Sequence, residues 1–545
     1  MTLVIRSIFY ILLLFTFICC HCCPKAAYCF DMFNEEFSEI FSLKDVEKLA
    51  YELAKKPFIN IDSQTINFLR NISEDTWKKI FLKDEERLWR EDNLPFEIGF
   101  IHPGFIYDQP VALYLVENGI SIPIEFAPEM FEYQDLSLQG KTNKNDLNFA
   151  GFCLYYPLTG SDDKDEIISF LGATHFKALA RHTVYGLTAR GMILNPAQPE
   201  GEEFPYFRKF WIVKPRPDDI CITIYALMDS PSMTGAFCFL IKPGTSTVVE
   251  VSVQLYPRTG VSLPKKIGLA PLGSMYLFSE KESGSQNDWR PEVHNSDNLL
   301  FLTSEKVWFR RPLNNPERLE INSFDLMNPQ GFGLMQYDNN FDHYQDIAAR
   351  FERRPSLWVE PLGDWGPGHL ELIEIPSVHD INDNILASWI SDQFFDQADT
   401  QKNSLQKPPY NFSYRLYWMS PGVSLNKLGR VASTRILFVN KREAAQFVID
   451  FEGEELKAIS ADTGLTSHVE TNTDTVIQEK YLLKNPVTGG WRLGFKLKLP
   501  KDNGVMQSIM SARGDRKSMR IQAFLKKGEN LPEALTEIWV YDLSY

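Results

Sequence analysis

The chain has 545 residues, which is enough for two or more domains with large cores, and its composition of 44% hydrophobic and 23% charged residues excludes a disordered protein. Aromatic residues make up 13% of it, which favours an all-β protein or a carbohydrate-binding protein over a helical bundle. The net charge of −15 argues against nucleic acid and against an anionic membrane surface as partners.

The first 23 residues have the pattern of a secretory signal peptide. Arg6 is the only charged residue before an almost wholly apolar run from Ser7 to Cys20. This run is shorter than the ~20 residues that a membrane span needs. An uncleaved anchor or a lipoprotein is the alternative. The pattern therefore predicts export.

Cysteine and histidine positions predict neither a disulfide scaffold nor a metal site. Only Cys153, Cys221 and Cys238 lie in the body of the chain, and no CxxC or HExxH spacing occurs there. No phosphate-binding glycine loop is present either. We therefore expect no metal and no cofactor.

Two short helices are expected near the start of the body. Ser42 can cap a helix with Asp45 three residues on, and an apolar face follows until Pro57. A second helix is expected to begin near Ser73 and to carry Trp77, Ile80 and Phe81.

From about residue 95 the pattern changes to strands. Val249, Val251, Val253 and Leu255 alternate with polar residues within Thr247–Tyr256, the period of a half-buried strand. Cys221–Leu227 and Ala236–Ile241 are expected to form a hairpin. Many such runs, separated by turn residues, predict an all-β protein built as a large β-sandwich.

A polar stretch with a double proline at residues 396–409 predicts a linker between two domains. Residues 30–395 would form the large sandwich. Residues 410–545 would form a smaller, immunoglobulin-like sandwich. Its expected strands include Phe412–Trp418, Phe447–Phe451, Trp491–Leu499 and Ile538–Tyr541.

The segment Asn328–Trp389 interleaves aromatic, acidic and amide side chains with glycine and proline turns. Such a mixture suits a surface that binds a sugar, because aromatic faces stack on pyranose rings while polar side chains bond the hydroxyls. Glycoside hydrolysis would need a protonated carboxyl and a second group that activates water. The alternative is that most of these carboxylates are solvated loop charges.

Asp383 is the strongest candidate for an acid. It lies between Asn382 and Asn384, directly before an apolar run that starts at Ile385. A carboxyl beside hydrophobic surface can have a raised pKa and donate a proton. The alternative is an ordinary capping or Asx-turn residue.

Trp365 lies in a glycine-rich loop that could present its indole to a ligand, or it packs on the sandwich edge. Arg354 could donate hydrogen bonds to sugar hydroxyl groups. The alternative is that Arg353 and Arg354 are surface residues that pair with nearby carboxylates. The residues expected to contact carbohydrate are Asp338, His343, Tyr344, Phe351, Arg354, Trp358 and Trp365.

A series of short motifs runs along most of the chain. They are FLGATHF (170–176), YGLTARG (185–191), EEFPYF (202–207), RPLNNP (311–316), NPQGFGLMQ (328–336), FDHYQD (341–346), RRPSLWVEP (353–361), EIP (374–376), DNI (383–385), YRLYW (414–418), NPVTGGWRL (485–493) and TEIWVY (536–541). These motifs, in this order, resemble those of the periplasmic glucan biosynthesis protein G/D family, and their shared order makes the resemblance specific.

The resemblance implies a mutarotase-like β-sandwich followed by an immunoglobulin-like domain. It also implies a periplasmic location in a Gram-negative type envelope, β-1,2-glucan as ligand, and a functional link to a membrane glucan synthase. The family includes anomer-inverting endo-β-1,2-glucanases. Their general acid is the Asp of the DNI motif, which is Asp383 here.

The family's water-activating Asp follows a His, and here that position is Asn295. An amide does not accept a proton near neutral pH. Asp297 could substitute if the segment is extended, but it would stand ~6–7 Å further along. Phe351 stands where relatives commonly carry Tyr. Two hypotheses follow, an inverting endo-β-1,2-glucanase and a non-catalytic glucan-binding biogenesis factor, with a purely structural envelope protein as a third.

Overall fold

The computed structural model describes residues 41–60, 68–135, 138, 147–160, 163–282, 288–394, 409–439, 443–462, 464–499, 518–528 and 534–544. The predicted signal peptide and all of the predicted linker except residue 409 lie outside the described residues. Within the described residues, no helix is both long and apolar enough to span a membrane.

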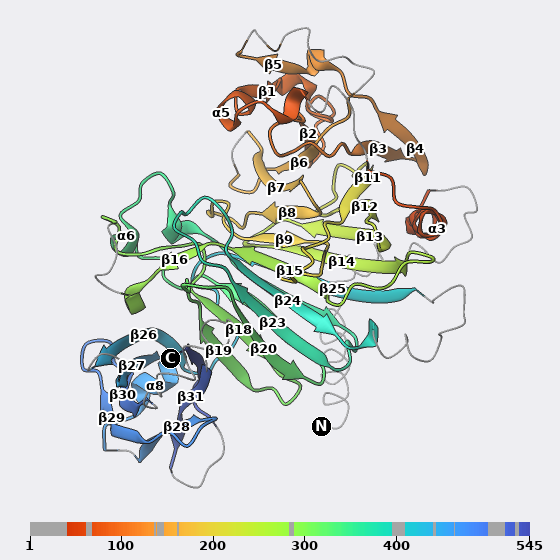
Figure 1. Ribbon diagram of the computed structural model, residues 1–545. Coiled ribbons are helices and arrows are strands. Elements are labelled where there is room, and N and C mark those ends of the chain that lie inside the picture. Colours follow the sequence, from red (N-terminus) through yellow and green to blue (C-terminus); the bar gives the residue numbers. More distant parts are fainter. Residues whose placement is uncertain are drawn as a thin grey trace, which may run out of the picture.

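The all-β class is confirmed, because two large sheets face each other in the centre of the molecule (Figure 1). The first sheet has the order β2-β6-β7-β8-β9-β15-β24-β23-β20, with β10 also paired to β15. Its strands are β2 (Glu97–Ile101), β6 (Gly151–Tyr156), β7 (Asp165–Leu171), β8 (His175–Ala178), β9 (Thr188–Arg190), β10 (Met192–Leu194), β15 (Ile267–Ser274), β20 (Glu320–Leu326), β23 (Gly368–Glu374) and β24 (Ile385–Ser391).

The second sheet has the order β28-β31-β32-β19-β18-β21-β22-β25-β14-β13-β12-β11-β3-β4. Its strands are β3 (Ala112–Glu117), β4 (Ile120–Ile124), β11 (Tyr206–Val213), β12 (Ile222–Asp229), β13 (Met233–Lys242), β14 (Ser246–Pro257), β18 (Asn298–Leu302), β19 (Trp308–Pro312), β21 (Gly331–Met335), β22 (Ser356–Leu362), β25 (Tyr410–Met419), β28 (Leu465–Thr471), β31 (Ser518–Lys527) and β32 (Ile538–Ser544).

The expected hairpin and the expected alternating strand are both confirmed as β12, β13 and β14. Every second residue of β14 is buried, because Val249, Val251, Val253 and Leu255 face the first sheet across the core. The phenylalanines of β13 join the same core, and the rings of Phe237 and Phe239 stack at 5.9 Å between centroids.

A smaller sandwich follows in the chain, at the lower left of Figure 1. Strands β28, β31 and β32 face a separate sheet across a core of their own. The strands of that sheet are β26 (Arg430–Val439), β27 (Ala444–Glu452), β29 (Ile477–Lys484) and β30 (Trp491–Lys498), and one short helix, α8 (Glu454–Ala458), follows β27.

The predicted start of the second domain at residue 410 is wrong. Strand β25 lies between β14 and β22 of the large sheet, and its alternate residues, such as Phe412 and Trp418, fill the large core. The chain crosses from the first sheet at β24 to the second at β25. A crossover between sheets runs over the surface and so has the same polar composition as a linker between domains.

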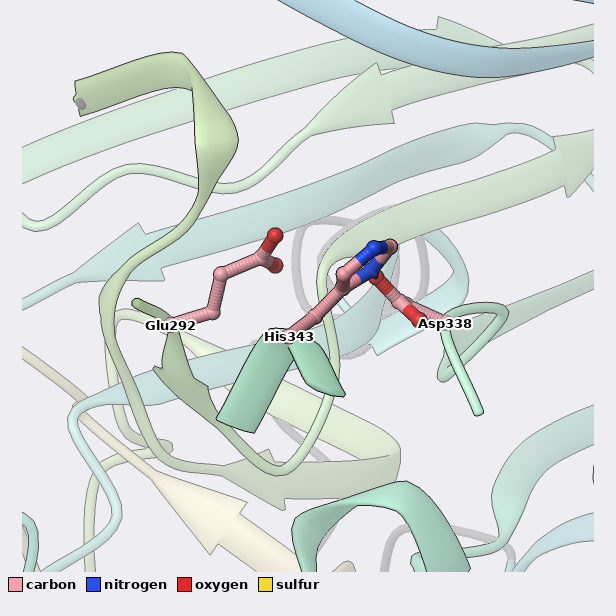
Figure 2. Close-up of side chains that lie close together, drawn as sticks. All are labelled: Glu292, Asp338 and His343. Atoms are coloured by element: carbon pink, nitrogen blue, oxygen red, sulfur yellow. The ribbon is translucent and has the colours of Figure 1, made fainter. Parts of the chain in front are cut away.

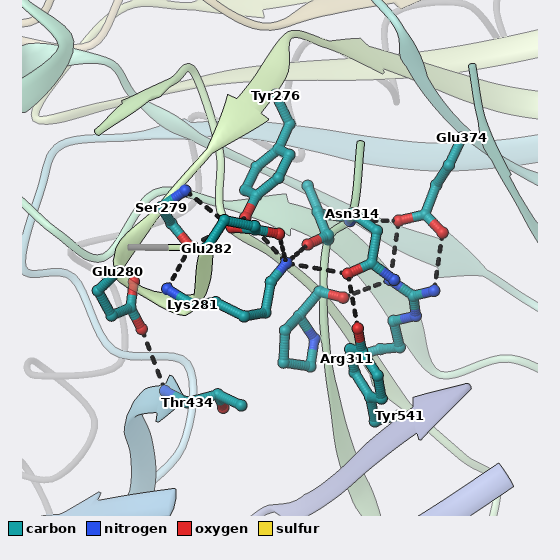
Figure 3. A network of polar contacts seen from close by, with 12 residues as sticks. Tyr276, Ser279, Glu280, Lys281, Glu282, Arg311, Asn314, Glu374, Thr434 and Tyr541 are labelled. Atoms are coloured by element: carbon teal, nitrogen blue, oxygen red, sulfur yellow. Dashed lines mark hydrogen bonds and ion pairs between the residues drawn. The ribbon is translucent and has the colours of Figure 1, made fainter. Parts of the chain in front are cut away.

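The two sandwiches share one sheet, because β19 pairs in parallel with β32. Polar contacts strengthen this junction (Figure 3). The Thr434 amide donates to Glu280 at 3.1 Å, and the Tyr541 hydroxyl bonds Asn314 at 3.1 Å. The small sandwich is therefore fixed to the side of the large one.

The capped first helix is confirmed as α3 (Leu43–Ala54), where the Ser42 amide donates to the Asp45 carboxylate at 2.8 Å. The second helix, α5 (Glu74–Trp77), starts after Ser73 as expected but spans one turn. The expectation that it carries Ile80 and Phe81 is wrong, because these residues form β1 (Ile80–Leu82) by pairing with β5 (Phe131–Tyr133).

The remaining short elements lie around the sheets. They are β16 (Tyr276–Phe278), its partner β17 (Val293–His294), α6 (Phe341–Tyr344), and the 3-10 turns η1 (Asp84–Glu86), η2 (Pro128–Met130), η4 (Glu280–Glu282) and η5 (Phe351–Arg353).

Candidate functional site

Asp383 lies just before β24, where three strands of the first sheet meet. Gly273 of β15 pairs with Thr188 of β9 on one side and with β24 on the other. The Thr188 hydroxyl donates to Asp383 Oδ2 at 2.7 Å. A Cβ on Gly273 would lie 2.6 Å from that same oxygen, so only glycine leaves room for the carboxyl here.

The neighbouring Asn384 fixes this turn. Its Oδ1 accepts from the Tyr276 amide at 2.8 Å, and its Nδ2 donates to the carbonyls of Tyr276 and Ile375 at 2.9 and 3.0 Å. The side chain thus bonds backbone groups as a neighbouring strand would. Because Asn384 is buried and fully bonded, the position of Asp383 is held from within the sheet.

The Asp383 side chain combines solvent access with a raised pKa. The residue is exposed, yet crowding by the surrounding protein disfavours its charged form and raises its pKa. The bond from Thr188 and the charges of Arg190 and Lys177 oppose this shift without cancelling it. A carboxyl in such a place can hold and donate a proton.

Asn295 contacts the segment that leads into β9, and the first residue of β9, Thr188, bonds Asp383. Its Nδ2 donates to the Gly186 carbonyl at 3.3 Å, and its backbone amide donates to Met275 at 2.8 Å. Gly186 precedes Thr188 by two residues, which is ~6–7 Å along an extended chain. The structure therefore brings Asn295 and Asp383 to one surface. We call Gly186, Thr188, Gly273, Asn295 and Asp383 the Asp383 site.

Asp297 does not join this site in the described part of the chain. Burial raises the pKa of its carboxyl, while the charges of His294 and Arg310 oppose the shift and that of Asp338 adds to it. None of these neighbours is among the groups that interact with Asp383, and none of the interactions found for Asp383 involves Asp297. The segment bends after β17 instead of continuing as a strand, so the condition for Asp297 to replace the missing base is not met.

A buried hydrogen-bond network lies under the site. Gln336 Nε2 donates to the Phe351 carbonyl at 3.1 Å, which turns its Oε1 towards His294 Nδ1 at 3.0 Å. His294 Nε2 faces Glu292 at 3.0 Å. Burial alone would lower the pKa of His294, but the bond and the charge of Glu292 outweigh it, and the net pKa is raised. An acceptor faces each ring nitrogen, which favours the protonated form of His294.

Four of the residues predicted to contact carbohydrate are buried, so these predictions are wrong as direct contacts. The Tyr344 hydroxyl is bonded by Gln336 at 2.8 Å, and Phe351 packs beside the Tyr344 ring. Trp358 stacks on Trp308. Trp365, only 1% exposed, packs against Phe412 and Tyr414 in the core.

Arg354 borders the Asp383 site. Its side chain packs against Gly186, where an added Cβ would lie 2.7 Å from Arg354 Cδ. Its Nη2 donates to the Ala349 carbonyl at 2.7 Å, and burial lowers its pKa to about 10. Arg354 is therefore a half-buried cation that packs on Gly186 at the edge of the Asp383 site.

Asp338 and His343 lie together on the other side of the His294 network. Figure 2 shows their side chains near that of Glu292. One ligand-type atom from each of the three residues lies within 4.8 Å of the other two. Asp338 and His343 belong to one segment and were singled out from the sequence, whereas Glu292 comes from a distant segment, so the sequence did not predict this three-residue cluster. His343 Nδ1 already bonds Asp338, and the pair needs no cation to explain its geometry. No contact joins the pair to Asp383 among the described residues.

The sequence identified Asp383 and Asn295 as candidates but not the residues that contact and position them. Thr188 and Gly186 lie in the YGLTARG motif, and Asn384 lies in DNI, so the family motifs carried a signal for them. Gly273 gave no signal, because its role depends on what packs over it.

Comparisons with known proteins place these residues in a family context. The family described as "Periplasmic glucan biosynthesis protein, MdoG" matches residues 41–543. A glucans biosynthesis protein G from Ralstonia nicotianae is 39% identical over 510 residues, covering 92% of this chain and 95% of the relative. One from Pseudomonas syringae pv. tomato is 38% identical over 475 residues, covering 85% of this chain and 72% of the relative.

Proposed function

Because the chain belongs to the periplasmic glucan biosynthesis family, we propose that it binds the β-1,2-linked backbone of an osmoregulated periplasmic glucan at the Asp383 site. The proposal includes export by residues 1–23 and action alongside a membrane glucan synthase. An apolar leader and the family's periplasmic description support it.

The site retains an acid but lacks a base. Asp383 has a raised pKa and solvent access, as a proton donor to a glycosidic oxygen requires. The observation that carries the proposal is the Asn295 amide, which occupies the place of the expected base and donates to Gly186. We therefore propose a glucan-binding biogenesis factor whose hydrolysis is slow or absent, in preference to an efficient endo-glucanase.

The test compares the wild-type protein with Asn295→Asp on linear β-1,2-glucan, with calorimetry for binding and chromatography for released oligosaccharides. A general base contributes roughly 10²–10⁴-fold to rate. We expect micromolar to millimolar glucan binding by both proteins, and at least a hundredfold faster release by Asn295→Asp. The double variant Asn295→Asp/Asp383→Asn should bind but release nothing.

Two results would contradict the proposal. Fast wild-type hydrolysis that Asp383→Asn abolishes would show that another group serves as base, and Asp297→Asn would then identify it. Absence of glucan binding by the wild-type protein would remove the proposed ligand and favour a structural role in the envelope.

A further inference from the structure

A surface pocket of ≈ 470 Å³ lies beside the Asp383 site and is lined by basic side chains. Arg181, Arg350 and Arg353 contribute guanidinium groups, and His182 stands among them. Among the residues that the structure describes, Glu352 is the only carboxylate of the lining. We call it the arginine pocket. Three positive charges against one negative charge are notable in a protein whose net charge is −15.

Each guanidinium is anchored through its Nε. Arg181 Nε donates to the Leu158 carbonyl at 3.0 Å, and Arg353 Nε donates to the His182 carbonyl at 2.9 Å. Arg350 Nε donates to Glu352 at 2.7 Å. These bonds orient the planar groups while leaving their terminal nitrogens for a ligand, so less side-chain freedom is lost on binding.

Glu352 adds a second signal that a ligand belongs here. The residue is 8% exposed, and its Oε1 accepts from Arg350. Its Oε2 has no hydrogen-bond partner among the described residues. A buried carboxylate oxygen without a donor is costly. A hydroxyl donor next to an anionic group would satisfy both Glu352 and the arginines.

One short segment of the chain joins the arginine pocket to the Asp383 site. The Val184 amide donates to the Arg353 carbonyl at 3.0 Å, and the chain then runs from His182 past Gly186 to Thr188. Six residue steps span at most ~20 Å. A glucan of a few sugar units at the Asp383 site can therefore extend into the pocket.

We propose that the arginine pocket binds an anionic group, a phosphate ester or a carboxylate, carried by the glucan that the Asp383 site holds. The inference rests on the proposed function for the position of the glucan, but the pocket's preference for an anion stands on its own residues. Arginine forks bind both groups through paired, charge-assisted hydrogen bonds.

The probes are glucose 6-phosphate, glucuronate and neutral glucose, each titrated by NMR or calorimetry into the full chain at low and at physiological salt. We expect both anions to bind and glucose to bind at least tenfold more weakly. Arg181→Gln and Arg353→Gln should each weaken anion binding roughly tenfold, and Arg353→Lys should weaken it less. Arg435→Gln, with the same loss of charge on the small sandwich, should change nothing. Thermal unfolding of each variant checks its folding.

A preference between the two anions identifies the phosphate ester or the carboxylate as the group. Equal binding of glucose and the anions, or anion binding unchanged in both glutamine variants, would overturn the inference. Linear neutral β-1,2-glucan serves as the separate arm. If it binds while the anions do not, the pocket proposal fails and the proposed function stands. If the anions bind and neutral glucan does not, the proposed function fails instead.

Discussion

Asn384 offers the most direct test of how the fold positions Asp383. Replacing it with alanine removes two buried hydrogen bonds, to the backbone groups of Tyr276, and one partly buried bond to the Ile375 carbonyl. A typical bond contributes about 1 kcal/mol net, and a buried partner left unsatisfied costs more. We expect the free energy of unfolding to fall by about 3 kcal/mol, with a loss of glucan affinity because Asp383 is no longer held.

The assay is urea unfolding followed by tryptophan fluorescence, together with glucan calorimetry. Asn411→Ala is the matched control, because this exposed residue accepts one side-chain bond from Gln254 and should cost less than about 0.5 kcal/mol. Asn384→Asp sharpens the test. It turns a donor into a carboxylate oxygen facing two carbonyls, so it should be more damaging than alanine at pH 7 and less so at acid pH.

An Asn384→Asp protein as stable as the wild type at pH 7 would contradict the orientation given to the Asn384 amide. An Asn384→Ala protein that is destabilised but keeps full glucan affinity would show that Asp383 does not depend on Asn384.

Three further predictions concern the site, the pH dependence and the junction between the sandwiches. Gly273→Ala would place a Cβ 2.6 Å from Asp383 Oδ2 and should weaken glucan binding in calorimetry, whereas Gly464→Ala, with no heavy atom within 4 Å, should not. Burial, followed by the charge of nearby Glu292, raises the pKa of Glu280 to about 7. Between about pH 4.5 and 7, Glu280 is therefore protonated in the folded state and ionised in the unfolded state. The free energy of unfolding falls as the pH rises through this range, because the buried carboxyl must then lose its proton on unfolding. Glu280→Gln should raise the urea midpoint at pH 8 and leave it unchanged near pH 4, and equal gains at both pH values would contradict this. Arg310→Met leaves the Glu537 carboxylate buried without the ion pair and should cost about 3–5 kcal/mol, while the double variant with Glu537→Gln should recover much of that loss in the same denaturation assay.

Local patterns in the sequence determined the elements whose signal is short-ranged. The period-2 alternation within Thr247–Tyr256 predicts β14, because one face of a strand must be apolar to cover a core. Ser42 predicts the start of α3, because its backbone amide and the Asp45 carboxylate bond over three residues. The position of Asp383 before an apolar run likewise predicts its place at the mouth of a strand.

Burial of the aromatic residues could not be read from the same patterns. A tryptophan between glycines, such as Trp365, can either present its ring to a ligand or pack it in the core. In the structure the ring packs against Phe412 and Tyr414 of the neighbouring strand β25. The place of β25 itself depends on pairing with β14 and β22, more than 50 residues away in the chain. The polar sequence before β25 is equally compatible with a connection between two sheets and with a boundary between two domains.

The sequence by itself determined the all-β class, the family and the two residues that define the question of function, Asp383 and Asn295. Only the tertiary structure decided what surrounds them. Thr188 meets Asp383 across 195 positions of sequence, and Gly186 meets Asn295 across 109. Such contacts are set by strand register and by packing between distant segments, which local propensity does not encode. The same long-range packing buries Asp297 near the charges of His294, Arg310 and Asp338 and places three arginines around one pocket.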